Sequence, residues 1–185
     1  IMYKMIGDDM AQMPTNIKGA MLTCILSDTL EFRSPTTTQE DTAIAHALAK
    51  DLGIDIAEYA AQMFAAKSDV SSFSEAELLR MDSKEYEVDG KKFRVSVLET
   101  TSPAAVLNRK DALMAAMPGV ATEDGADQVL LFVVDILNEE ATMLIPNDFT
   151  KSVAEKSFGA TVTGDSVVLP GVMSRKKQII PNIKA

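Results

Sequence analysis

Apolar residues recur every three or four positions through the first third of the chain, a pattern that predicts α-helices. Thr37 and Glu40 have the spacing of a capping box at the start of one helix, which would end at Gly53. The helix before it begins after Pro14. We expect its buried face to carry five residues: Ile17, Ala20, Met21, Cys24 and Ile25.

A polar, serine-rich segment at residues 68–73 interrupts the helical pattern and is predicted to be a linker. Directly after it, Ser74 and Glu77 again have capping-box spacing, so that a new helix should begin there. We therefore expect one domain over residues 1–67 and a second domain over residues 74–185.

Strands and helices alternate in the predicted second domain. Asp89-Gly90 lies between two short runs of alternating apolar and polar residues, which is a strong signal for a β-hairpin. Residues 128–136 are apolar nearly throughout and should form a central strand that is buried on both faces. Shorter strands are expected at 143–145, 160–163 and 167–169, so that the fold class of this domain is mixed α/β.

Composition and charge exclude several classes of function. The chain has 185 residues and a net charge of −9, which disfavours nucleic-acid and membrane partners unless a local basic patch overrides it. A single cysteine and a single histidine exclude an internal disulfide and any metal site that needs two of either residue. The longest apolar run, 129–134, is too short to span a bilayer, and no secretion signal opens the chain, so a cytoplasmic location is expected. Since the chain starts at Ile1 rather than Met, we expect it to be part of a longer protein.

The most informative charged segment is Ser174-Arg175-Lys176-Lys177-Gln178. Residues 166–185 contain four basic residues and no acidic residue, in a protein that is acidic as a whole. An arginine can bridge two phosphate oxygens with its planar guanidinium, and lysines add compact positive charge. Apolar residues flank the segment and indicate that it is anchored in a core, although a solvated charged tail is the alternative.

Asp28 is a second candidate for chemistry, because it stands at the end of an apolar helix. One carboxylate there can contribute to a divalent-cation site but cannot build one alone, and a helix-end or turn aspartate is the alternative. Asp135 lies inside the long apolar run, and we favour a structural pair for it. His46 is interpreted as a structural or surface histidine and Cys24 as a core residue, so no nucleophile–histidine pair is expected.

Five segments spread along almost the whole chain belong together: residues 2–4, 27–36, 81–86, 132–137 and 169–178. They contain a Ser-Asp motif, an Asp-x-Lys-Glu-aromatic segment, a central strand and the C-terminal basic segment. In these segments the chain resembles the family II inorganic pyrophosphatases, the manganese-dependent members of the DHH phosphoesterase superfamily. The C-terminal segment is the most specific of the five, and its spacing from Lys84 and Asp28 also fits.

The resemblance implies an α/β chain made of the helical tail of a DHH catalytic domain followed by the mixed α/β substrate-binding domain, the DHH-associated C-terminal domain. It implies the hydrolysis of inorganic pyrophosphate to two phosphates by a homodimeric, cytoplasmic parent enzyme. Asp28 would be a metal ligand, and Lys84, Arg175 and Lys176 would grip pyrophosphate. The cofactor would be Mn²⁺, with Co²⁺ or Mg²⁺ as alternatives, and no catalytic residue is assigned in this chain.

The family's Asp-His-His motif and its other aspartate and histidine ligands are absent from this sequence, so the chain alone is expected to be inactive. A related DHH phosphoesterase such as an exopolyphosphatase is one alternative, and a non-catalytic phosphate-binding module is another. The nucleotide-cleaving branch of the superfamily carries a Gly-Gly-rich motif in its C-terminal domain, whereas this sequence has no Gly-Gly pair.

Overall fold

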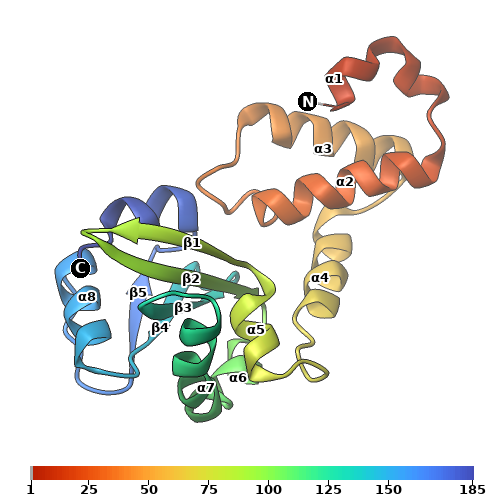
Figure 1. The fold of residues 1–185 in the computed structure, drawn as a ribbon. Helices are drawn as coiled ribbons and strands as arrows, with labels where there is room; N and C mark the ends of the chain where they lie inside the picture. Colours follow the sequence, from red (N-terminus) through yellow and green to blue (C-terminus); the bar gives the residue numbers. More distant parts are fainter. Residues whose placement is uncertain (1) are drawn as a thin grey trace. The chain divides into compact units, whose positions relative to one another are not determined.

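The computed structural model describes residues 2–185, which divide into two compact units (Figure 1). The first unit extends to Ala66, and the second comprises Lys67–Ala185. Among the described residues, no helix is both long enough and apolar enough to cross a lipid bilayer.

The described part of the first unit consists of helices joined by loops. The two longest helices, α2 and α3, pack against each other, and Leu22, Leu26 and Leu48 are almost completely buried. The helices of this unit are α1 (Met2–Ile6), the 3-10 helix η1 (Gly7–Gln12), α2 (Thr15–Thr29), α3 (Gln39–Leu52) and α4 (Ile56–Lys67).

The buried face of α2 differs from the predicted one. Leu22 and Leu26 are fully buried whereas Cys24 is exposed, so the prediction that Cys24 is a core residue is wrong. The apolar residues of α2 are spread over almost all sides of the helix. Helical spacing alone therefore could not select the face that packs. Lys18 lies on the buried stripe one turn before Leu22, and its ammonium pairs with the Asp51 carboxylate at 2.5 Å.

Helix α3 has both of its predicted end signals, one of them displaced by one residue. The capping box consists of Thr38 and Asp41 rather than Thr37 and Glu40. The N–H of Asp41 donates to Thr38 Oγ1 at 3.2 Å, and the N–H of Thr38 donates to Asp41 Oδ2 at 2.9 Å. Adjacent threonines precede adjacent acidic residues at the same spacing, so the sequence could not decide between them. At the other end, Gly53 adopts φ 66° and closes the helix as predicted.

The second unit is built on a five-stranded mixed sheet with the strand order β1-β2-β3-β4-β5. Strand β2 is parallel to β3, and every other neighbouring pair is antiparallel. Asp89 and Gly90 form the turn between β1 and β2, both with positive φ, which confirms the predicted hairpin. The strands are β1 (Ser83–Val88), β2 (Lys91–Thr100), β3 (Gln128–Asp135), β4 (Glu140–Leu144) and β5 (Ser166–Pro170).

Helices cover both faces of this sheet, so that β3 is buried on each side (Figure 1). On one face, Leu131 and Val133 belong to a core that includes residues of α5 and α7. On the other face, the ring of Phe132 meets that of Phe158 in α8 edge to face, with centroids 5.9 Å apart. The predicted central strand is therefore confirmed. The helices are α5 (Glu75–Met81), α6 (Pro103–Leu107), α7 (Lys110–Glu123) and α8 (Asp148–Phe158), and the π-helix η2 (Arg175–Ile179) and the 3-10 helix η3 (Ile180–Asn182) follow β5.

Two segments of the second unit differ from the structure that the sequence predicts for them. Residues 160–163 do not form the predicted strand; they belong to the irregular segment between α8 and β5, where Val162 is buried without joining the sheet. Segment 68–73, predicted to be a linker, is held on the second unit. Ser68 Oγ accepts the N–H of Thr101 at 2.9 Å, and Val70 is buried in the core.

We expect the second unit to fold by itself, and limited digestion with trypsin tests this. Lys67 ends α4 at the boundary between the units, and its side chain is 43% exposed. Digestion of the whole chain should cut first after Lys67 and leave a stable product of residues 68–185, since boundaries with few packing contacts are cleaved preferentially. The variant Lys67→Gln should lose this cut and keep the others. Even digestion of both units, or earlier loss of the second unit, would contradict the expectation.

Candidate functional site

The C-terminal basic segment forms a tight turn after the last strand. Strand β5 ends at Pro170, and Gly171 follows with φ 73°, a left-handed conformation that glycine adopts without strain. Residues Arg175–Ile179 then form a π-helix, in which the N–H of Ile179 donates to the carbonyl of Ser174 at 3.0 Å. Short π-helical turns of this kind occur frequently at functional sites.

Gln178 fixes the backbone of this basic segment. Its Oε1 accepts the N–H of Met173 at 3.0 Å and that of Ser174 at 2.9 Å, and its Nε2 donates to the carbonyl of Gly171 at 2.5 Å. Met173 and Ile179 are buried on either side of the basic residues. The segment is therefore anchored in the core, as its flanking apolar residues indicate, and it is not a solvated tail.

Arg175 connects the basic segment to the start of the first strand. Its Nη1 donates to the carbonyl oxygen of Asp82 at 2.8 Å, and its Nη2 donates to Asp82 Oδ1 at 2.7 Å. Asp82 directly precedes β1, and the two residues are 93 positions apart in the sequence. Because the side chain of Arg175 is only 14% exposed, these bonds compensate much of the hydration that the guanidinium loses.

The other two predicted cations are exposed on the same unit. Lys84 is the second residue of β1, opposite Val95 of β2, and Lys176 follows Arg175 in the π-helix. Within residues 2–185, neither ammonium group forms a hydrogen bond or an ion pair. The structure thus brings Arg175 beside the strand that carries Lys84 and leaves both lysines accessible to anions. We call Lys84, Arg175 and Lys176 the cationic set.

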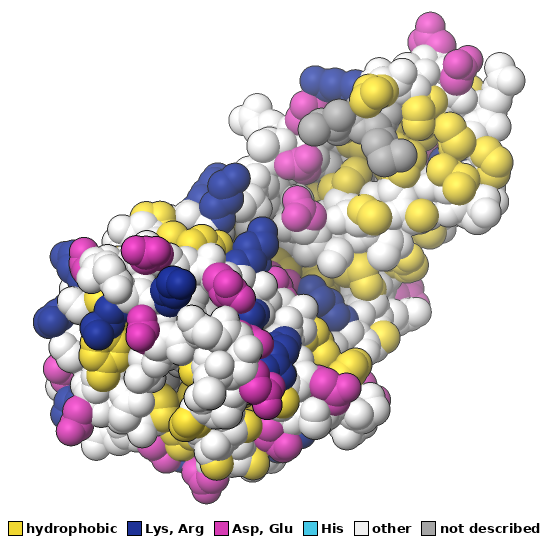
Figure 2. Space-filling model, in the orientation of Figure 1, with side chains coloured by type: hydrophobic (Ala, Val, Ile, Leu, Met, Phe, Trp, Pro, Cys, Tyr) yellow, Lys and Arg dark blue, Asp and Glu magenta, His cyan; other side chains and the backbone are white. Residues whose placement is uncertain are grey.

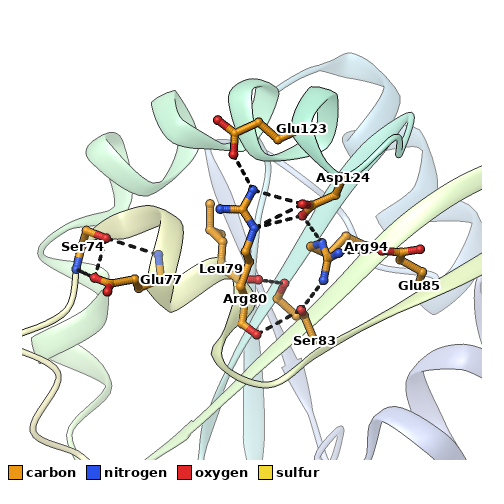
Figure 3. A network of polar contacts seen from close by, with 10 residues as sticks. Ser74, Glu77, Leu79, Arg80, Ser83, Glu85, Arg94, Glu123 and Asp124 are labelled. Atoms are coloured by element: carbon orange, nitrogen blue, oxygen red, sulfur yellow. Dashed lines mark hydrogen bonds and ion pairs between the residues drawn. The ribbon is translucent and has the colours of Figure 1, made fainter.

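A network of charged side chains, which we call the charged network behind β1, packs on one face of that strand (Figure 3). It consists of Arg80, Glu85, Arg94 and Asp124, together with the hydroxyl of Ser83. Because successive side chains of a strand point to opposite faces, Ser83 and Glu85 face this network and Lys84 faces away from it. Arg94 of β2 donates from Nη1 to Ser83 Oγ at 2.6 Å and from Nη2 to Glu85 Oε1 at 2.7 Å. Its Nε lies 2.5 Å from Asp124 Oδ2. The network therefore holds the residues on both sides of Lys84 and fixes the orientation of the strand.

Asp124 joins the elements that meet in this charged network. It directly follows α7 and accepts three hydrogen bonds from Arg80 of α5, of which the two shortest, from Nε to Oδ2 and from Nη2 to Oδ1, are each 3.1 Å long. The hydrogen bonds from Arg80 lower the pKa of the Asp124 carboxyl most, and the nearby charge of Arg94 lowers it further. The ionised form of Asp124 is therefore the one that links α5, α7 and β2.

Two supporting residues of this region, Arg94 and Asp124, carry no sequence signal that would identify them, and Asp82 is marked only as the first residue of the Asp-x-Lys-Glu-aromatic segment. Strand alternation predicts that the neighbours of Lys84 face away from it, which is the one further clue that the sequence contains. The partners of the long-range contacts are 93 positions apart for Arg175 and 44 for Arg80. Neither capping signals nor the periodicity of apolar residues reports on pairs so distant in sequence.

Asp28 belongs to the first unit and is exposed near the end of α2. The chain turns sharply after it, because Leu30, Glu31 and Phe32 have φ of 50°, 51° and 70°. Residues other than glycine rarely adopt this left-handed region. Three such residues in succession therefore strain the backbone next to Asp28. The hydroxyl of Thr29 accepts the N–H of Phe32 at 3.3 Å and helps to hold the turn.

The described residues give Asp28 no companion metal ligands. Within residues 2–185, no group of three or more His, Cys, Asp or Glu side chains is placed to hold a metal ion. Since a two-metal centre requires several such ligands, these residues do not by themselves form one.

Asp135 and His46 have structural surroundings. Asp135 Oδ1 accepts the N–H of Leu137 at 2.9 Å and that of Asn138 at 3.1 Å, so this aspartate shapes the turn after β3. Its partners are amides rather than a charged side chain, which corrects the expected structural pair. His46 is exposed, and its ring stacks on that of Phe32 with centroids 5.8 Å apart, in agreement with its interpretation as a surface histidine.

These features define a mixed α/β domain whose anchored, cationic C-terminal segment lies beside its first strand. The family model described as the DHHA2 domain matches residues 61–185, which is more than half of the chain. The chain therefore belongs to the DHHA2 domain family.

Similar proteins extend the comparison over nearly the whole chain. Two are named "Probable manganese-dependent inorganic pyrophosphatase". The one from Lactobacillus acidophilus is 37% identical over 182 residues, which are 98% of this chain and 58% of that protein. The one from Deinococcus radiodurans is 44% identical over 169 residues, which are 89% of this chain and 54% of that protein. A solved structure named "Crystal structure of Methanococcus jannaschii putative family II inorganic pyrophosphatase" is 34% identical, with a TM-score of 0.80 over 92% of this chain and 55% of that one.

The chain thus spans between half and three fifths of the length of these relatives. The resemblance to family II pyrophosphatases that the sequence motifs indicate is confirmed, and so is the α/β fold class.

Proposed function

We propose that this chain is the substrate-binding portion of a metal-dependent phosphohydrolase that converts inorganic pyrophosphate to two phosphates. The observation that carries the proposal is the contact between Arg175 and Asp82, because it sets the basic segment beside the strand of Lys84. The reaction is suggested by the similar proteins, which are named as manganese-dependent inorganic pyrophosphatases.

The cationic set has the chemistry that pyrophosphate requires. The guanidinium of Arg175 can bridge two phosphate oxygens with those N–H groups that Asp82 does not use. Lys84 and Lys176 add exposed positive charge that would neutralise the phosphates and the leaving group. Positioning and charge stabilisation of this kind are the main contributions that proteins make to phosphoryl transfer.

Manganese belongs to the longer parent protein in this proposal. Asp28 would contribute one carboxylate ligand, a type of ligand that suits Mn²⁺. Because the described residues contain no group of three ligands, the metal is not assigned to this chain alone, and no step of the reaction is derived from it.

Pyrophosphate should bind weakly to the isolated chain at the cationic set. Each contact of the exposed lysines is screened by salt and should contribute about 1 kcal/mol or less. In a titration followed by amide NMR shifts, Lys84→Gln should weaken binding by about fivefold or less. Arg175→Lys should weaken it as well, because an ammonium cannot bridge two oxygens. The control Lys156→Gln removes the same charge from an exposed position of α8 and should change the affinity much less.

Two outcomes of this titration would contradict the proposal. The shifted resonances could lie away from the cationic set, or the Lys84 and Arg175 variants could titrate like Lys156→Gln. Either result would show that the basic residues form a solvated face without a site. A parallel titration with sulfate measures how strongly the cationic set attracts a smaller tetrahedral anion of lower charge.

A further inference from the structure

Among residues 2–185, the guanidinium of Arg175 is held by Asp82 alone. The two hydrogen bonds occupy one N–H of Nη1 and one N–H of Nη2. An arginine side chain has five N–H groups, so three stay available for another acceptor. Since the side chain is held along one edge and is only 14% exposed, it presents these remaining donors in a fixed direction.

Asp82 is itself immobilised between α5 and β1. Its carbonyl oxygen also accepts the N–H of Val97 at 2.9 Å, which ties the residue to β2. The hydroxyl of Ser83 donates to the carbonyl of Arg80 at 3.3 Å and accepts from Arg94 Nη1 at 2.6 Å (Figure 3). The charged network behind β1 therefore anchors the turn from which Asp82 reaches Arg175.

The carboxylate of Asp82 acts on an approaching anion in two opposite ways. As a negative charge it repels the anion, but it is 54% exposed, so that water and salt weaken the repulsion. As a hydrogen-bond acceptor it orders Arg175 before the anion arrives, and the ordering of a long side chain is then no longer required on binding. The enclosed position of Arg175 and its two short bonds to one residue favour the second effect.

We propose that Asp82 is a positioning residue, which orients Arg175 so that its free N–H groups face an incoming phosphate group. The part of this inference that concerns phosphate rests on the proposed function. The orientation of the free guanidinium does not depend on it and can be measured without any anion.

Two substitutions separate orientation from charge. Asp82→Asn keeps an acceptor oxygen and removes the charge, whereas Asp82→Ala removes both. Glu87→Gln is the matched control, because it removes one charge from an exposed residue of the adjoining strand β1, on the side away from Lys84. In the absence of anions, NMR of the arginine side chains should show separate, slowly exchanging Nη signals for Arg175 in the wild-type chain and in Asp82→Asn, and averaged signals in Asp82→Ala. The signals are assigned by their loss in Arg175→Lys.

The effect on binding is tested by titration with pyrophosphate of the wild-type chain, Asp82→Asn, Asp82→Ala and Glu87→Gln. Asp82→Asn should bind within about twofold of Glu87→Gln, and Asp82→Ala should bind about two- to fivefold more weakly than that control. In an Arg175→Ala background, Asp82→Ala should cause no further loss, because the effect passes through the arginine. A midpoint of urea unfolding that is unchanged from the control excludes a general loss of structure as the cause.

The outcomes distinguish this inference from the proposed function. Equal or tighter binding by Asp82→Ala than by Glu87→Gln would overturn it, and so would averaged Nη signals of Arg175 in the wild-type chain. If the wild-type chain bound no pyrophosphate, the proposed function would fail. In that case separate Nη signals that are lost in Asp82→Ala and kept in Asp82→Asn would still support the orienting role, and signals unaffected by Asp82→Ala would overturn it.

Discussion

Hydrolysis of pyrophosphate by the purified chain in the presence of Mn²⁺ should not exceed the background rate. Enzymes accelerate their reactions by about 10⁶-fold or more, and in metal-dependent phosphoryl transfer this depends on a complete metal centre. Residues 2–185 hold no group of three candidate ligands, and Asp28 offers one carboxylate. We therefore expect the whole acceleration, about 10⁶-fold or more, to be missing. The measurement is phosphate release from pyrophosphate with and without added Mn²⁺.

The variant Arg175→Ala controls for contaminating phosphatases in this assay. Activity that comes from a contaminant should be the same in wild-type and variant preparations. Phosphate release that requires Mn²⁺ and is lost in Arg175→Ala would show that the chain is an enzyme by itself, and the assignment of the metal to a longer parent protein would be wrong.

The substitution Phe132→Ala should lower the free energy of unfolding by about 3–5 kcal/mol. Phe132 lies in the central strand β3, is fully buried and packs edge to face against Phe158 of α8. Removal of the ring deletes buried apolar surface and leaves a cavity that the rigid sheet cannot close. Urea unfolding followed by circular dichroism measures the loss, with residues 67–185 monitored through their strand signal.

Leu137→Ala is the control for this substitution. Leu137 lies two residues after the end of β3 and is 60% exposed, so its truncation should change the free energy of unfolding by about 0.5 kcal/mol or less. Similar losses for both variants would mean that α8 does not form a tight layer on the sheet.

Local signals in the sequence were sufficient for many elements of the fold. The capping box of Ser74 and Glu77 starts α5 as predicted, and Asp89-Gly90 closes the hairpin of β1 and β2. These predictions succeed because each depends on the conformation of a few neighbouring residues, which their side chains determine. The prediction of β3 from its long apolar run succeeds for a different reason. Both faces of this strand are buried, so the prediction did not have to decide which face packs against the core.

Predictions that require knowledge of a packing partner failed or were incomplete. Helical spacing predicts Cys24 on the buried face of α2, but packing on α3 selects the stripe of Leu22 and Leu26. Residues 160–163 have the composition of a strand but pair with no strand of the sheet. In both cases tertiary structure decided between local alternatives that the sequence left nearly equal.

The candidate site shows the same division between local and distant information. The basic residues of the C-terminal segment are evident from the sequence, and the buried flanking residues Met173 and Ile179 agree with its anchoring. The contact of Arg175 with Asp82 is not evident, because the two residues are 93 positions apart and the motif that contains Asp82 does not indicate its partner. The joint action of Lys84, Arg175 and Lys176 on pyrophosphate stays a prediction for the titrations to test.

The contact between Arg175 and Asp82 also sets an order of events during protein synthesis. The ribosome adds Asp82 and the strands of the sheet first, and Arg175 follows 93 residues after Asp82. The nascent chain can therefore pair β1 with β2 long before the arginine exists. A premature stop after β5 would leave every strand in place and remove the whole basic segment. Such a product would retain its folded sheet, but Lys84 would be without the guanidinium that Arg175 places beside its strand.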